Sequence, residues 1–288
     1  MENKLTFNKK IGSQKKSRII SNIFLNIILM AGSFITMLPL IWMFLSSVKP
    51  SKEIIQMPPT FLPANLTFNN FKELFNTLPF MRFLFNSLFV TIISTVVLVL
   101  VAALTGFVFA KFKFYGKKII YSIILMTMMI ADEIVVLPLY LMIVRVHLNN
   151  TYIALIIPFL VTGFAVFLMR QFISTIPNNL IEAAVIDGAS YLQIFYKIII
   201  PLISPALGTL AIFNFIWMWN MLMWPVIAID SEKMMTLQVA MSRFTSMYLT
   251  RYDLSMAAAT IATIPILILY LALQRTFVKG IALTGIKQ

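Results

Sequence analysis

The sequence predicts an all-α membrane protein with six transmembrane helices. Hydrophobic residues make up 60% of the 288 residues, the mean hydropathy is +0.92, and the apolar residues gather in long runs between polar segments. No soluble domain carries that balance. A helix of about 20 residues crosses a bilayer core about 30 Å thick, because each residue adds about 1.5 Å. We therefore expect one transmembrane domain over residues 1–288.

Composition also limits the possible functions. The chain has no cysteine and one histidine, which excludes disulfides, thiolate metal sites and a histidine cluster for zinc. No G-x-x-x-x-G-K-[ST] phosphate-binding loop is present, so any ATP that drives the protein must bind to another polypeptide. The net charge of +13 mainly reports which side of the bilayer the basic residues occupy. Nucleic acid is a weaker interpretation, because no separate basic domain exists.

The first part of the chain contains a basic segment and a long apolar run. Residues 1–18 hold six basic residues, and the run from 19 to about 46 is too long for the core of a signal peptide. It also lacks a small-x-small cleavage site, so we expect an uncleaved first span. Residues 48–82 are polar and rich in proline, which predicts a partly ordered external loop.

The remaining spans follow from the apolar runs. A basic turn around Gly116 joins spans two and three, and the stretch 173–201 follows span four. The expected ranges are 84–110, 119–144, 152–172, 202–228 and 255–274 for spans two to six, 229–252 for a second external loop, and 275–288 for the tail.

The basic residues predict the orientation. If both termini are cytoplasmic, fifteen Lys and Arg residues lie inside and eight lie outside, the eight being spread over longer loops. Cytoplasmic loops carry the excess of basic residues in membrane proteins. We therefore expect a multi-pass protein of the bacterial or archaeal cytoplasmic membrane, with the stretch 173–201 in the cytoplasm.

Residues 173–201, which we call the two-helix loop, read as two short helices joined by a sharp turn. Pro177 suits the first turn of a helix, and Gly188 falls where a helix ends in a left-handed residue. Ser190 and Gln193 have the spacing of a capping box. Pro201 is expected to stop the second helix or to start another. The small side chains of residues 183 and 184 would let another surface approach closely.

The same stretch resembles the cytoplasmic EAA loop of ABC-importer permeases. That pattern is Glu-Ala-Ala, three residues, Gly, nine residues, Ile, any residue, an aliphatic residue and Pro. Asp187-Gly188-Ala189-Ser190 is further similar to the carbohydrate-uptake branch, the relatives of the smaller permease subunit of the maltose transporter. A chance helix–turn–helix in a membrane protein is the alternative. The residues of this chain that match the EAA-loop pattern, with all of its spacings, are Glu182, Ala183, Ala184, Gly188, Ile198, Ile200 and Pro201.

The resemblance covers nearly the whole chain, and it implies a type I ABC importer permease fold. It implies a subunit that forms half of the pathway of an importer for an oligosaccharide or a sugar derivative. The implied partners are a second, homologous permease, an ATPase dimer that binds ATP and Mg, and an extracytoplasmic sugar-binding protein. The chain would be no enzyme and would bind no cofactor itself. The residues implied to couple it to the ATPase are Glu182, Ala183, Ala184, Asp187, Gly188, Ile198 and Pro201.

Four polar or aromatic residues are candidates for lining the pathway. Asp132 and Glu133 lie near the middle of span three, where charges usually face a cavity or a partner; the alternative is a helix break beside a wet surface. Trp219 and Asn220 resemble a recurrent Trp-Asn pair of sugar permeases, and aromatic faces stack on sugars. Interfacial anchoring is the alternative for tryptophan, and we expect it for Trp224.

The tail resembles the C-terminus of the maltose-type small permease, which reaches between the two ATPase subunits. Gly280, Gly285 and Lys287 match that stretch, and a disordered tail is the alternative. Two other functions remain open from the residues alone. One is a membrane-embedded enzyme that uses Asp132 and Glu133 as an acid pair, and the other is an ATP-independent secondary transporter in which the same two acids carry protons.

Overall fold

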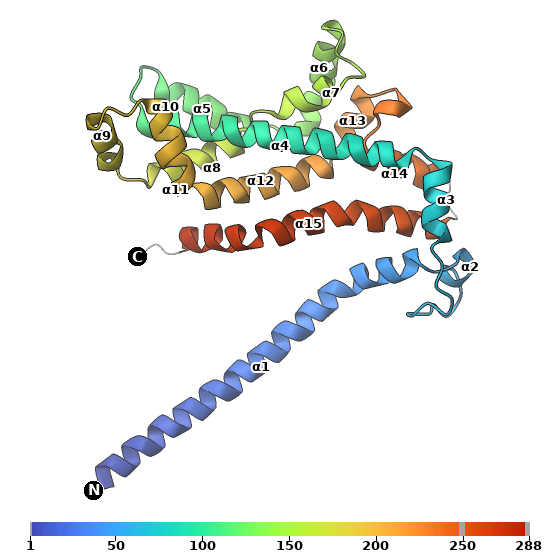
Figure 1. The fold of residues 1–288 in the computed structure, drawn as a ribbon, viewed down its shortest axis with the longest axis horizontal. Coiled ribbons are helices and arrows are strands. Elements are labelled where there is room, and N and C mark those ends of the chain that lie inside the picture. The colour runs from blue at the N-terminus through green and yellow to red at the C-terminus, as the bar shows by residue number, and fades with distance from the viewer. Residues whose placement is uncertain (1, 248–250, 286–288) are drawn as a thin grey trace. The chain divides into compact units, whose positions relative to one another are not determined.

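A computed structural model describes the backbone of residues 2–247 and 251–285, and the side chains of residues 22–243 and 251–274 (Figure 1). Within those residues the chain is helical and contains no strand. It divides into two compact units, residues 1–72 with 251–260 and residues 73–250 with 261–288. The predicted all-α class is confirmed.

Three helices are long and apolar enough to cross a membrane alone. They are α1 (Glu2–Ser47), of which Asn22–Ser47 is the candidate span, α4 (Phe80–Lys111), and α15 (Tyr252–Gly285), of which Tyr252–Gln274 is the candidate span. Three further apolar segments are pairs of helices bent at a short break, and counting each pair as one span gives up to six. The expected six spans are obtained when each bent pair is counted as one span, and three of the six are then broken helices.

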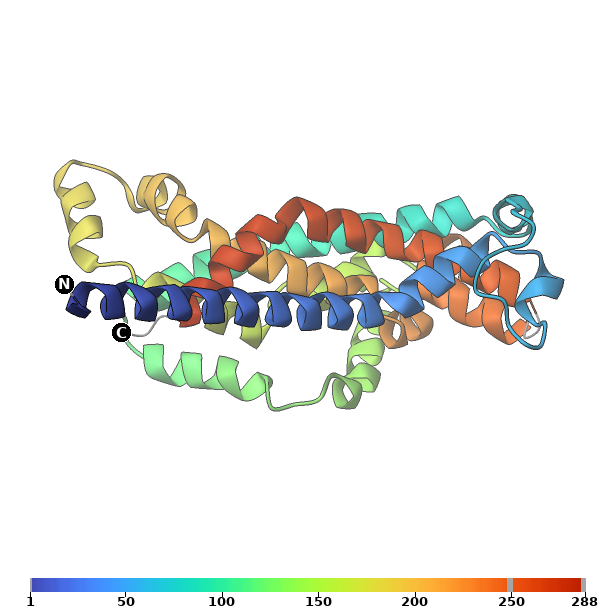
Figure 2. The same cartoon turned by 90° about the horizontal axis from the view of Figure 1, so that it is seen from below.

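The third span shows the sharpest break. Helix α5 (Lys117–Thr127) and helix α6 (Asp132–Arg145) meet at 102°, a turn that is visible in Figure 2. Two acids open α6, and carboxylates are stabilised in the first turn of a helix by its dipole. Hydropathy alone does not register this break, because the residues within it, 128–131, are apolar.

The other two breaks coincide with proline or a helix cap. Helices α7 (Tyr152–Ile156) and η1 (Ile157–Phe159) bend by 47° into α8 (Gly163–Ser174), whose first turn is capped by the hydroxyl of Thr162. Helix α12 (Ser204–Trp219) is bent by 77° from the helical run before it, and Pro205 stands in its first turn.

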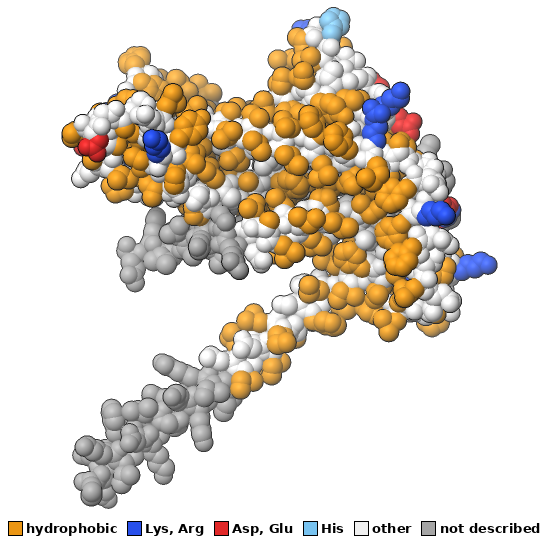
Figure 3. All heavy atoms as spheres, viewed as in Figure 1, with side chains coloured by type: hydrophobic (Ala, Val, Ile, Leu, Met, Phe, Trp, Pro, Cys, Tyr) orange, Lys and Arg blue, Asp and Glu red, His pale blue; other side chains and the backbone are white. Residues whose placement is uncertain are grey.

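The second unit has its core between α4, α8 and α12. The backbones of α4 and α8 approach closely at Gly106, where an added Cβ would lie 2.7 Å from the Met169 Cβ and 2.9 Å from the Arg170 backbone nitrogen. Gly163 allows a similar approach of α8 to α5, because a Cβ there would lie 2.7 Å from the Ile124 carbonyl oxygen. Figure 3 shows that hydrophobic side chains cover much of the visible face of these helices, as expected for a surface that meets lipid or other apolar helices.

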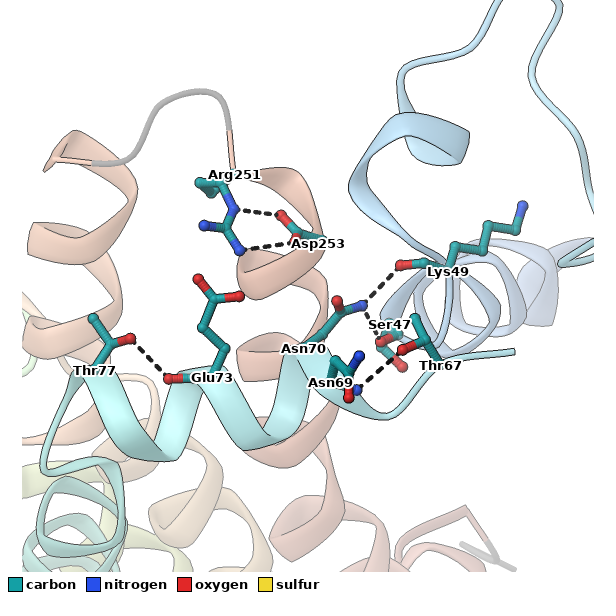
Figure 4. Close-up of polar contacts among 9 residues, drawn as sticks. All are labelled: Ser47, Lys49, Thr67, Asn69, Asn70, Glu73, Thr77, Arg251 and Asp253. Atoms are coloured by element: carbon teal, nitrogen blue, oxygen red, sulfur yellow. Dashed lines mark hydrogen bonds and ion pairs between the residues drawn. The ribbon is translucent and has the colours of Figure 1, made fainter. Parts of the chain in front are cut away.

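The first unit contains α1 and the ordered segment that follows it. The Asn70 side chain donates to the carbonyls of Ser47 and Lys49, both at 2.8 Å, and so satisfies groups left free where α1 ends (Figure 4). The Ala64 backbone N–H and the Thr60 hydroxyl donate to Glu53, and these bonds hold the pKa of that carboxyl below its ordinary value. Residues 48–72 of the loop predicted at 48–82 are thus ordered by polar contacts of their own.

The remaining helices are short, and some of them form the helical run that bends into α12. They are α2 (Ser51–Ile54), α3 (Asn69–Thr77), α9 (Asn178–Ile186), α10 (Tyr191–Ile194), η2 (Phe195–Ile199), α11 (Ile200–Leu202), α13 (Met223–Ala228), η3 (Glu232–Met234) and α14 (Leu237–Met247).

We expect Gly106→Ala to lower the thermal stability of the protein. The added Cβ meets backbone atoms of α8, which cannot rotate away, and overpacking of this kind costs about 1–3 kcal/mol. Gly32→Ala is the control, because no atom lies within 4 Å of its added Cβ and alanine favours a helix. Fluorescence-detected thermal unfolding in detergent should show a lower midpoint for Gly106→Ala only; equal midpoints would contradict the close approach of α4 and α8.

Candidate functional site

The first helix of the two-helix loop ends in a Schellman motif. Helix α9 begins after Pro177, which stands at its N-cap position and not in its first turn as expected. At the other end Gly188 has φ of +80°, as predicted. The Gly188 N–H donates to the Val185 carbonyl at 3.0 Å and the Ala189 N–H to the Ala184 carbonyl at 2.9 Å, which is the bond pattern of that motif.

The second helix begins with the predicted capping box. The Ser190 hydroxyl accepts from the Gln193 N–H at 3.3 Å, and the Gln193 side chain accepts from the Ser190 N–H at 2.9 Å. Residues 195–199 then form a π-helical turn, and the Ile200 N–H bonds to the Phe195 carbonyl. Pro201 lies inside the helical run and does not end it. Pro201 stands in the first turn of α11, as in the second of the two expected alternatives, and the bend comes after Leu202.

The inner face of the loop belongs to the main core of the second unit. Ile194 and Ile199 are fully buried, Ile181 is buried, and Ala184 packs partly buried against the same cluster. The loop therefore has no core of its own and is packed onto the ends of the spans. The cluster includes Leu98, Ala103 and Phe107 of α4, Ala165, Met169 and Ile173 of α8, and Ala206 and Leu210 of α12.

A lysine ties the loop to the end of α4. The Lys111 ammonium donates to the Ile176 carbonyl and, at 2.9 Å, to the Asn178 side-chain oxygen. Ile176 follows α8, and Asn178 opens α9. A charged donor to a carbonyl near a helix C-terminus is favoured by the helix dipole. This contact fixes the chain where it passes from α8 into the loop.

The outer face of the loop is exposed and largely apolar. Ile186 is 84% exposed and Leu192 is 64% exposed, while Glu182 and Ala183 are exposed beside them on α9. Exposed apolar side chains that gather in one place mark an interaction surface. Of the remaining motif residues, Asp187 and Pro201 are exposed and Ile198 is partly buried.

The structure places Asp132 and Glu133 at the start of α6, immediately after the break in the third span. Both side chains are exposed in the described chain. The helix break that was the alternative interpretation of these acids is observed. A role for them in lining a pathway stays a prediction.

Trp219 and Asn220 lie at the end of α12 in different surroundings. Trp219 is 2% exposed, its indole N–H donates to the Ala262 carbonyl at 3.1 Å, and its ring stacks on Phe215. Asn220 is exposed, and its side chain donates to the Ile216 carbonyl. In this conformation Trp219 joins α12 to α15, and its proposed contact with substrate stays a prediction.

Trp224 was expected to anchor the protein at the membrane interface, and that expectation is wrong. Its side chain is 2% exposed, and its indole N–H donates to the Ala154 carbonyl at 3.0 Å. The residue packs inside the second unit because α13 turns back against α7 after the break at residues 220–222.

Two asparagines join helix ends that lie away from the two-helix loop, and sequence reasoning assigned them no contact. The buried Asn86 donates to the Met235 carbonyl at 2.8 Å and accepts from the Tyr152 hydroxyl at 2.7 Å. The side-chain oxygen of Asn150 accepts from the N–H groups of Asp230 and Ser231. An asparagine within an apolar run indicates a buried hydrogen bond, because buried amides need partners. The sequence does not show which residue is the partner.

The predicted contacts of the tail cannot be placed. Gly280 and Gly285 belong to α15, but side chains beyond residue 274 and the whole of Lys287 lie outside the described residues. Contact of the tail with an ATPase stays a prediction.

These features define a polytopic helical membrane protein with a two-helix loop built into its core. Residues 99–283 match the family of the binding-protein-dependent transport system inner membrane component. The chain belongs to that family, whose members are permease subunits of ABC transporters.

Relatives and a solved structure agree with this assignment. The chain is 33% identical over 258 residues to the arabinooligosaccharides transport system permease protein AraQ of Halalkalibacterium halodurans, covering 88% of this chain and 92% of the relative. It is 30% identical over 271 residues to the sn-glycerol-3-phosphate transport system permease protein UgpE of Pectobacterium atrosepticum, covering 90% and 95%. The fold matches a chain of a bacterial ABC transporter involved in the import of the acidic polysaccharide alginate. The TM-score is 0.79 and the identity is 25%, and the match covers 91% of this chain and 98% of that chain. The type I ABC importer permease fold is thereby confirmed.

Replacement of Trp219 by phenylalanine distinguishes packing from substrate contact. The variant loses the bond to the Ala262 carbonyl and part of the buried volume, so we expect a lower thermal midpoint, with a cost of about 1–3 kcal/mol. An unchanged apparent KM of transport would limit Trp219 to packing. Trp217→Phe is the matched control, because that tryptophan of the same helix is 39% exposed. A raised KM with an unchanged midpoint would instead assign Trp219 to the pathway.

Proposed function

We propose that this chain is a permease subunit of an ATP-driven, binding-protein-dependent importer of an oligosaccharide or a sugar derivative. Membership of the permease family and the names of the relatives support the class of substrate. The chain forms half of the translocation pathway together with a second, homologous permease. An ATPase dimer binds ATP and Mg, because this chain has no phosphate-binding loop. An extracytoplasmic binding protein delivers the sugar.

The two-helix loop is the element that receives the ATPase motion. The observation that carries this proposal is its two-sided construction: an apolar outer face is exposed around Ile186 and Leu192, while the inner face is buried among α4, α8 and α12. A partner that seats on the outer face therefore displaces the spans through close-packed side chains, which transmit strain. Glu182 and Ala183, exposed on α9, supply a charge and a small contact to that partner.

The proposed orientation places the loop and both termini in the cytoplasm. The fifteen-to-eight distribution of basic residues supports it. The helix ends that carry the Asn86 and Asn150 bonds then lie outside, where the binding protein docks. The contacts of Asp132, Glu133, Trp219 and Asn220 with sugar, and of Gly280, Gly285 and Lys287 with the ATPase, belong to the same proposal.

Gly188→Val tests the coupling role. The residue has φ of +80°, and a β-branched side chain is strained there even though no atom lies within 4 Å of the added Cβ. The Schellman turn should open and α9 should lose its position. We expect normal amounts of variant in the membrane, with loss of ATPase co-purification and of sugar uptake.

Gly188→Asn is the matched control, because asparagine tolerates the left-handed conformation. It should retain most of the uptake and of the co-purified ATPase. If Gly188→Val keeps both at the level of the unmodified protein, the loop is not the coupling element.

A further inference from the structure

A cluster of positive charge lies where the turn between α4 and α5 meets α8. The guanidinium carbon of Arg170 on α8 is 4.1 Å from the centre of the Tyr121 ring on α5. The charges of Arg170 and Lys113 both act on Lys117. In the part of the chain whose side chains are described, no ion pair involves these three basic residues. Like charges held together cost free energy unless an anion lies among them.

Two buried donors in this cluster have no acceptor. The Arg170 Nε and the Tyr121 hydroxyl are both buried and lack a hydrogen-bond partner among the described residues. A buried donor without a partner is costly, and each such group in a folded protein calls for an explanation. Lys117 donates to the Phe112 carbonyl at 2.8 Å, which leaves its other ammonium protons free to bind a ligand. The cluster therefore has donors for a multiply charged oxygen ligand.

The surface beside the cluster is apolar. Along α5, Ile119, Ile120 and Ile123 are exposed by 67%, 46% and 57%. The ligand that fits both surfaces has an anionic head and a hydrocarbon body. A phospholipid has both, whereas a free phosphate would leave the isoleucines uncovered.

We propose that this cluster binds an anionic phospholipid, with its phosphate on Lys113, Lys117 and Arg170 and an acyl chain along the exposed isoleucines of α5. Basic sites between membrane helices are suited to such headgroups. Bound there, the lipid joins α5 to α8, which leads directly into the two-helix loop.

The test measures lipid binding to the assembled transporter by native mass spectrometry. The probes are phosphatidylglycerol and the zwitterionic phosphatidylcholine, each titrated into the detergent-purified complex with and without millimolar inorganic phosphate. Lys113→Gln with Lys117→Gln should weaken phosphatidylglycerol binding by about 30-fold, because each basic residue near an anionic lipid contributes about fivefold. Lys113→Gln alone changes only an exposed side chain and should weaken it by about fivefold.

Lys118→Gln is the matched control. Lys118 is an exposed residue of the same turn and is not among the charges that act on Lys117, so its replacement should leave phosphatidylglycerol binding nearly unchanged. Equal binding of phosphatidylglycerol to the double variant and the unmodified complex would overturn the proposal. Equal binding of phosphatidylcholine, or displacement of the lipid by inorganic phosphate, would overturn it as well.

Discussion

The two-helix loop depends on a hydrophobic core that is formed largely by the spans. Ile181, Ile194 and Ile199 are buried, but the side chains that cover them include those of α4, α8 and α12. A short helix such as α9 is marginal by itself in water, because nucleation is costly and little packing offsets it. The loop is therefore stable only in the place where the spans hold it, and a force applied to it acts on those spans.

Helix α4 is held at both of its ends by polar side chains. At one end Lys111 bonds to the chain on each side of the junction between α8 and α9. At the other, Asn86 and Ser87 bond to the backbone of residues 233–237. Between these ends Gly106 lets the backbone of α8 approach closely. These contacts make α4 a frame that joins the loop to the opposite side of the protein, and they suit it to carry a displacement along its length.

Local chemistry made some features of the site predictable. Gly188 and the Ser190–Gln193 pair act within a few residues, so the left-handed turn and the capping box followed from spacing. The break at residues 220–222 did not, since apolar residues flank it, and the break at residues 128–131 was signalled only by the two acids that follow it. The burial of Trp219 and Trp224 depends on how α12, α13 and α15 pack, and no single-sequence pattern carries that information. The same holds for the partners of Asn86.

The exposed face of α9 offers the most direct measurement. A photo-crosslinking amino acid at Ile186, which is 84% exposed, would report what lies against the loop in a transporter that still takes up sugar. The same label at the exposed Glu232, on the opposite side of the membrane in the proposed orientation, provides the comparison. The account predicts a crosslink from residue 186 to the ATPase and none from residue 232 to the ATPase. An active transporter in which residue 186 forms no crosslink to the ATPase, or in which residue 232 does, would contradict it.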